Sequence, residues 1–293
     1  MGTERMAPVL RPEISHQVTA TDQIGVVERN FSFFERIQNI SILRKFAILV
    51  LIALVWEMYT WIFGVQALLF PRFSVVFLAL VDSLASGELI LRIGASLRVL
   101  CIGYTIGLIL GLFLSTLAVT SRIGSDFLST MTSLFNPLPA IALLPLALLW
   151  FGLGMGSLVF VLIHSVLWPV ALNTHTGFLA VPTTLRMVGR NYGLSGLNYV
   201  IRILVPAAFP SILSGLKIGW AFAWRTLIAA ELVFGATGSS GGLGWFIYQN
   251  RYEMNTDYVF AGLFTVIVIG FMVENLIFRQ IELRTVNKWG MQV

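Results

Sequence analysis

Few side chains in this sequence belong to the types that carry out chemistry. The histidines are His16, His164 and His175, and Cys101 is the single cysteine. One cysteine excludes a disulfide framework and any zinc or iron–sulfur site that needs several cysteines. His164 and His175 are about three helical turns apart and can share a helix face, but no carboxylate accompanies them. We therefore expect interior histidines with hydrogen-bond partners, no metal site and no catalytic residue.

A glycine-rich stretch at residues 235–244 resembles a phosphate-binding loop only in its glycine content. A Walker A loop needs the pattern G-x-x-x-x-G-K-[ST], in which the lysine and backbone amides hold phosphates. This stretch has no lysine, so we expect a flexible or tightly turned loop outside the membrane. No cofactor is expected in the chain.

Four ionisable residues interrupt otherwise apolar segments, namely Glu57, Arg225, Glu231 and Glu274. Such a group inside a bilayer costs roughly 2.5–3.5 kcal/mol and needs a partner or a purpose. Arg225 and Glu231 are six residues apart, so on one helix they point about 120° apart and meet different neighbours. Arg225 either faces a solute path, where it would favour an anion, or pairs with Glu57 or Glu274.

Prolines interrupt one apolar segment at Pro137 and Pro139. Proline removes a helical hydrogen bond, and membrane helices tolerate such breaks where the freed groups face protein or a water-filled cavity. The segment is either a helix broken near a pathway or a helix with a simple packing kink.

The elements that position these residues are membrane spans. Hydrophobic residues make up 57% of the 293 residues and charged residues 11%, and the mean hydropathy is +0.85. These values exclude an ordinary soluble domain and a disordered chain. The apolar segments lack the alternation of a β-barrel, so we expect an all-α polytopic membrane protein. Its six predicted spans are 46–70, 99–121, 127–151, 157–179, 211–234 and 257–278.

Basic residues predict the orientation of these spans. Lys and Arg are concentrated in the loops that share a side with the two termini, so both termini and the loop after the fourth span are predicted to be cytoplasmic. The sequence pI of about 9.7 then follows from membrane topology, and no nucleic-acid partner is needed.

The flanking segments are predicted separately. Residues 1–44 form a cytoplasmic tail, of which 31–44 are either an interfacial helix or part of a disordered tail. Residues 45–285 form the transmembrane domain and 286–293 a second cytoplasmic tail. The pattern of residues 72–97 predicts a helix at the outer surface that leads into the second span. A seventh span is the less favoured alternative.

The long cytoplasmic loop at residues 180–206 has the signals of two short helices. Pro182 suits a first helical turn, Gly193 a left-handed helix end, Ser195 the next N-cap, and Pro206 the end of that second helix. Such a projecting unit without catalytic groups predicts a docking surface.

This loop resembles that of the permease subunits of binding-protein-dependent ABC importers. Their pattern is E-A-A, three residues, Gly, nine residues, Ile, one residue and Leu-Pro. Gly193, Ile203 and Pro206 match it, whereas Val205 replaces the leucine and residues 187–189 replace E-A-A. Further segments are similar to the nitrate/sulfonate/taurine-type branch, and Glu231 is the residue that this branch's pattern carries over. These segments are 137–146, 150–154, 206–217, 224–232 and 242–244.

The resemblance implies a type I ABC importer permease in a bacterial inner membrane, surrounded by lipid. Two copies would form the pathway, ABC ATPase subunits would bind ATP and Mg and receive the cytoplasmic loop, and a periplasmic or lipoprotein binding protein would deliver a small anion such as a sulfonate or nitrate. A secondary transporter that needs no ATPase is the alternative. The residues expected to contact the ATPase are Met187, Val188, Gly189, Tyr192, Gly193, Leu194, Ser195, Ile203 and Pro206. Those expected in the pathway or its gates are Pro137, Pro139, Arg225 and Glu231.

Overall fold

The computed structural model describes residues 41–234 and 241–288, and these residues form helices and no β-strand. The predicted all-α fold is confirmed for this part of the chain. The chain divides into two compact units, residues 1–55 and 56–293. The described part of the first unit, residues 41–55, belongs to the first helix. Of the interfacial helix considered at 31–44, residues 31–40 lie outside the described residues and 41–44 belong to this first helix.

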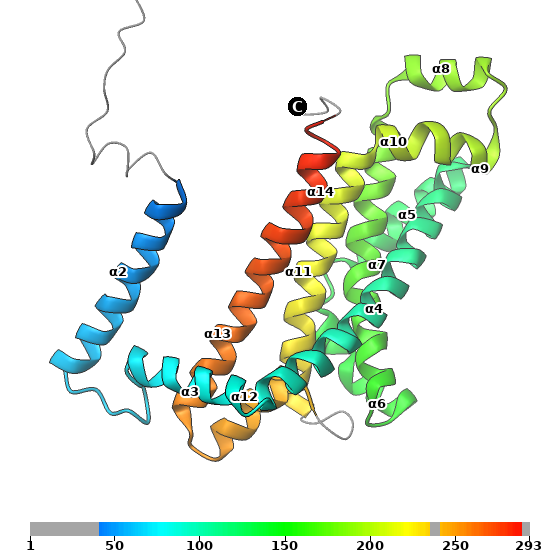
Figure 1. The fold of residues 1–293 in the computed structure, drawn as a ribbon. Helices are drawn as coiled ribbons and strands as arrows, with labels where there is room; N and C mark the ends of the chain where they lie inside the picture. Colours follow the sequence, from blue (N-terminus) through cyan, green and yellow to red (C-terminus); the bar gives the residue numbers. More distant parts are fainter. Residues whose placement is uncertain (1–40, 235–240, 289–293) are drawn as a thin grey trace, which may run out of the picture. The chain divides into compact units, whose positions relative to one another are not determined.

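Helices follow one another along the described chain with short connections (Figure 1). One short element, η3, is a 3-10 helix, and two others, η4 and η5, are π-helical. The elements are α2 (Ser41–Ile62), α3 (Phe73–Ala85), α4 (Glu88–Val119), α5 (Arg122–Phe135), η3 (Ala140–Leu143), α6 (Leu144–Phe151), α7 (Met155–Ala180), α8 (Thr183–Asn191), α9 (Gly196–Tyr199), η4 (Val200–Leu204), α10 (Val205–Ala207), α11 (Phe209–Phe234), α12 (Leu243–Tyr252), α13 (Thr256–Met272), η5 (Val273–Phe278) and α14 (Arg279–Arg284).

Four helical segments among the described residues are long and apolar enough to cross a membrane. They are Leu43–Ile62 in α2, the whole of α4, the whole of α7, and the run Thr256–Arg284. Two bent pairs bring the number to six when each pair is one span. One joins α5 to η3 and α6 with a bend of 86°, and the other joins Gly196–Ala207 to α11 with a bend of 79°. The prediction of six spans agrees with this arrangement, and the first bent pair contains Pro137 and Pro139.

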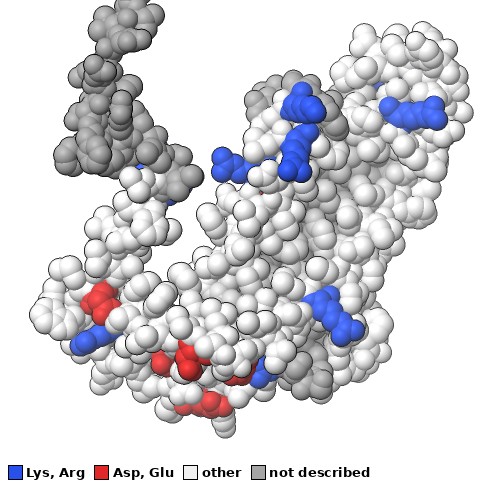
Figure 2. Space-filling model, in the orientation of Figure 1, with Lys and Arg blue, Asp and Glu red and all other residues white. Residues whose placement is uncertain are grey.

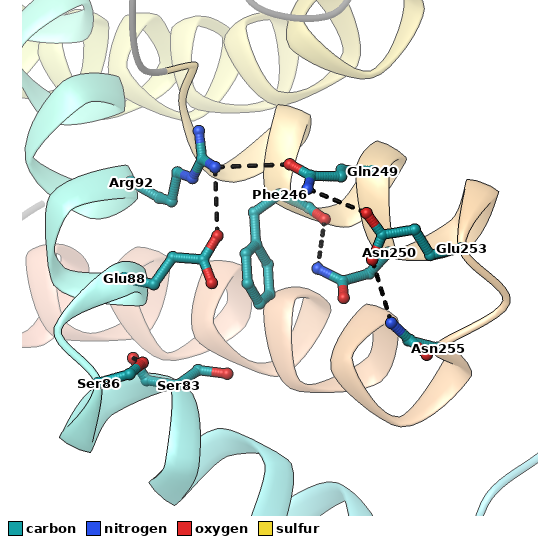
Figure 3. Close-up of polar contacts among 9 residues, drawn as sticks. All are labelled: Ser83, Ser86, Glu88, Arg92, Phe246, Gln249, Asn250, Glu253 and Asn255. Atoms are coloured by element: carbon teal, nitrogen blue, oxygen red, sulfur yellow. Dashed lines mark hydrogen bonds and ion pairs between the residues drawn. The ribbon is translucent and has the colours of Figure 1, made fainter.

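The second span begins earlier than hydropathy predicts. The prediction starts at residue 99, but α4 begins at Glu88, where a polar network reaches α12 (Figure 3). Arg92 Nη2 donates to Glu88 Oε1 at 3.2 Å and to Gln249 Oε1 at 3.5 Å, and Gln249 Nε2 donates to Glu253 Oε1 at 3.1 Å. Because these polar groups satisfy one another at the helix end, the helix extends beyond its apolar stretch.

The first span ends earlier than predicted, at Ile62 instead of residue 70. Near this end, the Glu57 carboxylate accepts hydrogen bonds from Ser74 N at 3.0 Å and from Ser74 Oγ at 2.8 Å. Ser74 lies in the first turn of α3, where free N–H groups and the helix dipole favour a carboxylate. Helix α3 matches the separate helix that the segment 72–97 predicts before the second span.

Helix α7 lies between α4 and α11 at the centre of the second unit (Figure 1). Gly103, Gly107 and Gly111 recur every fourth residue on the face of α4 that meets α7. A Cβ atom on Gly107 would lie 2.8 Å from the Cβ of Val166, closer than two such atoms approach in folded proteins. The glycine stripe therefore lets the two backbones approach closely, as small residues do in many membrane helix pairs.

In the view of Figure 2, acidic side chains are seen near one end of the second unit, where basic ones lie beside them, and basic side chains are seen at the other end. Asp and Glu side chains gather at the end formed by α3 and α12. Lys and Arg side chains are prominent at the opposite end, which carries α8 and the last turns of α14. The long helices run between these ends, so the distribution of charged side chains differs along the helix axes.

Candidate functional site

The segment between α7 and α11 forms two helical arms joined by a glycine turn. After α8, Gly193 has a left-handed backbone with φ +70°, which glycine adopts without strain. Its N–H donates to the carbonyl of Arg190 at 2.9 Å, and the N–H of Leu194 donates to the carbonyl of Gly189 at 3.0 Å. The predicted helix, glycine turn and helix are confirmed. Ser195 occupies the N-cap position of α9 as predicted, but its side chain makes no capping hydrogen bond.

Two sets of contacts hold this loop in shape. Arg186 Nε donates to the carbonyl of Val181 at 3.1 Å and Arg186 Nη2 to that of Phe178 at 2.5 Å, so its guanidinium satisfies the C-terminal end of α7. Gly189 is buried, and a Cβ atom there would lie 2.9 Å from Cγ1 of Ile203. The first arm is thus packed directly against the second and anchored to a membrane-spanning helix.

The first arm and the start of the second arm expose apolar side chains, and we name this set of side chains the α8 patch. Tyr192, directly after the last residue of α8, is 81% exposed. Exposed apolar surface of this kind marks sites of interaction. The patch consists of Leu185, Met187, Val188, Tyr192 and Leu197. Met187, Val188 and Tyr192 are among the residues expected from the sequence to contact an ATPase.

Pro206 does not end the second arm, contrary to prediction. The helical run from Gly196 continues through α10 to Ala207, and the chain bends at Ala208 before α11. Pro206 stands in the first turn of α10, after a π-helical stretch. Proline is tolerated there because a residue in a first turn needs no intrahelical acceptor for its N–H.

A cavity of about 350 Å³ lies where the broken span meets α7 and α11, and we name it the central cavity. The break itself, residues 135–141, forms one wall, so Pro137 and Pro139 both line the cavity. Each of the other walls is one face of a helix. On α11 the lining residues are separated by three, one and three positions, which is the spacing of residues that share a helix face. The helix residues that line it are His164, Ser165, Trp168 and Pro169 from α7, and Phe222, Arg225, Thr226 and Ala229 from α11.

Arg225 is the one charged side chain among the described residues that line the central cavity. Its Nε donates to the carbonyl of Ala221 at 2.9 Å, and its guanidinium carbon lies 5.3 Å from the ring centroid of Phe222. In the described residues no carboxylate forms an ion pair with Arg225, and Glu57 is instead bonded to Ser74. The structure therefore gives no support to a helix–helix ion pair at Arg225, which is exposed on α11.

Glu231, on the same helix, lies outside the central cavity and is 2% exposed. Ser96 Oγ donates to its carboxylate at 2.9 Å, and the N–H of Gly244 donates to Oε2 at 2.8 Å. Ser96 Oγ also accepts the N–H of Leu243 at 2.8 Å. We name these residues together with Gly242 the Glu231 cluster. It joins α4, α11 and the start of α12, because the carboxylate accepts from a hydroxyl of α4 and from a backbone N–H of α12.

The glycine-rich stretch differs from the loop expected there. Residues 235–240 lie outside the described residues, but 241–244 are buried, and Leu243 begins a helix, α12, that the sequence analysis did not predict. A Cβ atom on Gly242 would overlap Glu231 Oε1 and Ser96 Oγ. Gly242 and Gly244 are therefore needed for close backbone approach to the carboxylate.

The two histidines of α7 have different surroundings. His175 Nε2 lies 3.0 Å from Ser125 Oγ, as expected for an interior histidine with a partner. His164 departs from that expectation, because neither ring nitrogen has a hydrogen-bond partner among the described residues. Within those residues no three His, Cys, Asp or Glu side chains are grouped as metal ligands would be.

Comparison with known proteins decides the family. Residues 103–284 match the family of binding-protein-dependent transport system inner membrane components. The chain belongs to this family. It is 30% identical to the putative aliphatic sulfonates transport permease SsuC of Escherichia coli, over 75% of this chain and 82% of the relative. It is 29% identical to SsuC of Bacillus subtilis, over 80% and 83%, and 30% identical to the nitrate import permease NrtB of Synechocystis sp., over 64% and 66%.

The protein is thus a permease subunit of an ABC importer and a multi-pass membrane protein. In this permease the fold brings together Pro137, Pro139 and Arg225, which the sequence singled out separately, and keeps Glu231 apart from them. Sequence analysis missed His164 and Trp168 as cavity residues. His164 and Trp168 are four positions apart on an apolar helix, so the sequence indicates that they share a helix face. It does not indicate which neighbouring helix or cavity that face meets.

Proposed function

We propose that two copies of the permease enclose a pathway for a small anion, with the central cavity of each copy on it. The observation that carries this proposal is Arg225. Its side chain is exposed 16 residues into the 26-residue helix α11, at a depth where contact with lipid would cost about 2.5–3.5 kcal/mol. A second copy packed over this face would cover the guanidinium and leave its remaining donors to the solute.

The sign of the solute's charge follows from the same cavity. Its described lining includes Arg225 and no Asp or Glu, so the local field favours an anion. The names of the relatives, sulfonate and nitrate permeases, are consistent with an anionic solute.

We propose that the α8 patch docks into an ABC ATPase subunit that binds ATP and Mg. The support is an exposed apolar surface on an arm anchored by Arg186 to α7, one of whose faces lines the central cavity. Closure of two ATPase subunits would move the two docked loops together, and α7 and α11 would pass that movement to the cavity walls. The ATPase hydrolyses ATP, and the permease contributes no catalytic group.

The orientation is proposed from charge. The end with α8 and α14 would be cytoplasmic because Lys and Arg are retained there, and with six spans the N-terminus would lie on the same side. The opposite end, with α3 and α12, would receive a periplasmic or lipoprotein binding protein that delivers the solute. Gating is the role proposed for Glu231, which holds the first turn of α12 at that end.

The pathway is tested by transport in proteoliposomes that contain the permease, its ATPase and its binding protein. Arg225→Gln should reduce ATP-dependent uptake of the anion at least about tenfold, and Arg225→Lys should retain part of it, because lysine keeps the charge and loses the planar donors. Unchanged uptake by Arg225→Gln would overturn the proposal. Uptake that persists in vesicles without the ATPase would favour a secondary transporter instead.

The docking proposal is tested at Gly193. In Gly193→Arg, a bulky cation at a position with φ +70° should strain the turn and block ATPase binding, so the ATPase no longer co-purifies. Gly87→Arg is the matched control, because Gly87 also has a positive φ, +78°, and open space around it, but lies between α3 and α4. Equal ATPase co-purification by both variants would contradict docking at this loop.

A further inference from the structure

Three ring nitrogens at the central cavity have no hydrogen-bond partner among the described residues. They are Nδ1 and Nε2 of His164 and Nε1 of Trp168, and all three are shielded from solvent. Buried polar groups in folded proteins are nearly always hydrogen-bonded, and an unpaired one needs an explanation. Both side chains line the central cavity, so a ligand there provides the missing partners when the two rings turn toward it.

The polar groups of the cavity are mainly donors. The Trp168 indole and the Arg225 guanidinium can only donate, and a neutral His164 has one donor and one acceptor. The amide of Asn136, which also lines the cavity, has two N–H donors and one acceptor oxygen. Ser165 and Thr226 add little, since Ser165 Oγ is already bonded to the carbonyl of Val161 at 3.1 Å and lies 3.2 Å from Thr226 Oγ1. This lining suits a ligand with several acceptor oxygens.

The rest of the lining is strongly aromatic. Phe135 and Trp168 stack with ring centroids 5.0 Å apart and planes 9° apart, and His164 meets both rings edge-on at 6.3 and 6.2 Å. Phe222 forms a further aromatic wall beneath Arg225. Aromatic side chains bind flat unsaturated groups by offset stacking and by edge-to-face contact.

The size of the cavity also favours a solute with a carbon body. A volume of about 350 Å³ falls within the range of about 300–1,000 Å³ that is typical of sites for organic ligands. A bare inorganic oxyanion such as nitrate would leave most of that volume unfilled and would touch few of the aromatic walls.

We propose that the central cavity is a specificity site for organic anions with an aromatic body, and that His164, Trp168 and Phe135 distinguish them from inorganic anions. The charged head group binds Arg225, and the ring packs against the wall of Phe135 and Trp168. The side chains of Trp168 and His164 turn their N–H groups toward an acceptor oxygen of the bound solute. This inference rests on the proposed pathway and adds to it which anions the permease itself prefers.

Direct binding to the permease–ATPase complex in nanodiscs, without the binding protein, tests this preference. The radiolabelled probes are benzenesulfonate, ethanesulfonate and nitrate, so that the first two share a head group and differ in the body. We expect benzenesulfonate to bind at least about tenfold more tightly than ethanesulfonate, and nitrate to bind most weakly. Nitrate binding as tight as that of benzenesulfonate, or no binding of any probe, would overturn the inference.

Single substitutions test which residues cause the preference for benzenesulfonate. Trp168→Phe keeps an aromatic ring and loses the N–H, so benzenesulfonate and ethanesulfonate should both weaken about five- to tenfold. Phe135→Leu should weaken benzenesulfonate alone and reduce the ratio between the two sulfonates. Trp61→Phe is the control, because Trp61 is exposed on α2 and distant in sequence from every cavity residue.

The outcomes separate this inference from the proposed pathway. If Trp168→Phe and Phe135→Leu bind all probes like the unchanged complex, the specificity site is wrong, whatever Arg225→Gln does to uptake. If Arg225→Gln transports normally, the pathway itself is wrong. A variant that fails to assemble with the ATPase, as judged by size-exclusion chromatography, is replaced by His164→Phe, for which the same loss of sulfonate affinity is expected.

Discussion

Two of the three charged side chains of helix α11, Arg225 and Glu231, lie six residues apart in opposite environments. Glu231 is buried, and its carboxylate accepts hydrogen bonds from Ser96 and Gly244. Arg225 is exposed at a cavity, and among the described residues its one hydrogen bond runs from Nε to the carbonyl one turn back. A carboxylate that accepts hydrogen bonds from two other helices ties those helices together, whereas a guanidinium with donors left over can bind a solute. We therefore propose that a charged residue of α11 holds neighbouring helices at one position and meets the solute at the other.

The largest effect is expected from a substitution that adds volume to the Glu231 cluster and leaves its polar groups unchanged. In Gly242→Ala the added Cβ would overlap Glu231 Oε1 and Ser96 Oγ, so we expect the permease to lose about 3 kcal/mol or more of stability. The apparent melting temperature of the purified complex measures the loss. Gly94→Ala, two residues before Ser96 and with open space around it, should leave that temperature unchanged. Equal melting of the two variants would show that the cluster does not hold α12.

A smaller effect is expected from removing the polar partners singly and together. Ser96→Ala and Glu231→Ala should each cost about 1–3 kcal/mol, because each leaves buried groups unpaired, and the double variant should cost clearly less than their sum. The free energies come from thermal or denaturant unfolding of the complex. Arg225→Ala combined with Glu231→Ala should instead be additive, since the two residues share no partner among the described residues.

The smallest effect on stability is expected at the cavity. Arg225→Met should change the free energy of unfolding by no more than about 0.5 kcal/mol while it abolishes anion uptake, because no described contact other than the bond to Ala221 and the Phe222 ring depends on it. Lys217→Met is the matched control on the same helix, since it breaks the part-exposed ion pair with Glu282, worth about 0.2–1 kcal/mol, at a residue that does not line the central cavity. A large loss of stability in Arg225→Met would assign Arg225 to structure.

Much of the fold could be predicted because its causes are local. Long apolar segments, the breaks at Pro137 and Pro139, and the turn at Gly193 each follow from residues close together in the chain. The helix ends were less accurate: α4 begins at Glu88 because Arg92 finds partners on α12, which hydropathy cannot show. Pro206 was misplaced as a helix end because the π-helical stretch before it is not visible in sequence.

The sequence by itself determined a polytopic helical membrane protein, since a bilayer admits little else for segments this long and apolar. Its resemblance to ABC importer permeases came from the motifs of the 180–206 loop and of the spans. It also identified the charged residues of α11, since every such group in a span is costly. Only the tertiary structure decided their roles. Glu231 meets Ser96 across 135 residues of chain, and Arg225 meets the broken span and α7, so the environment that separates them arises from long-range contacts. Long-range contacts also decide the surroundings of four other residues. These are Gly242 and Gly244 at the carboxylate, and His164 and Trp168 at the cavity.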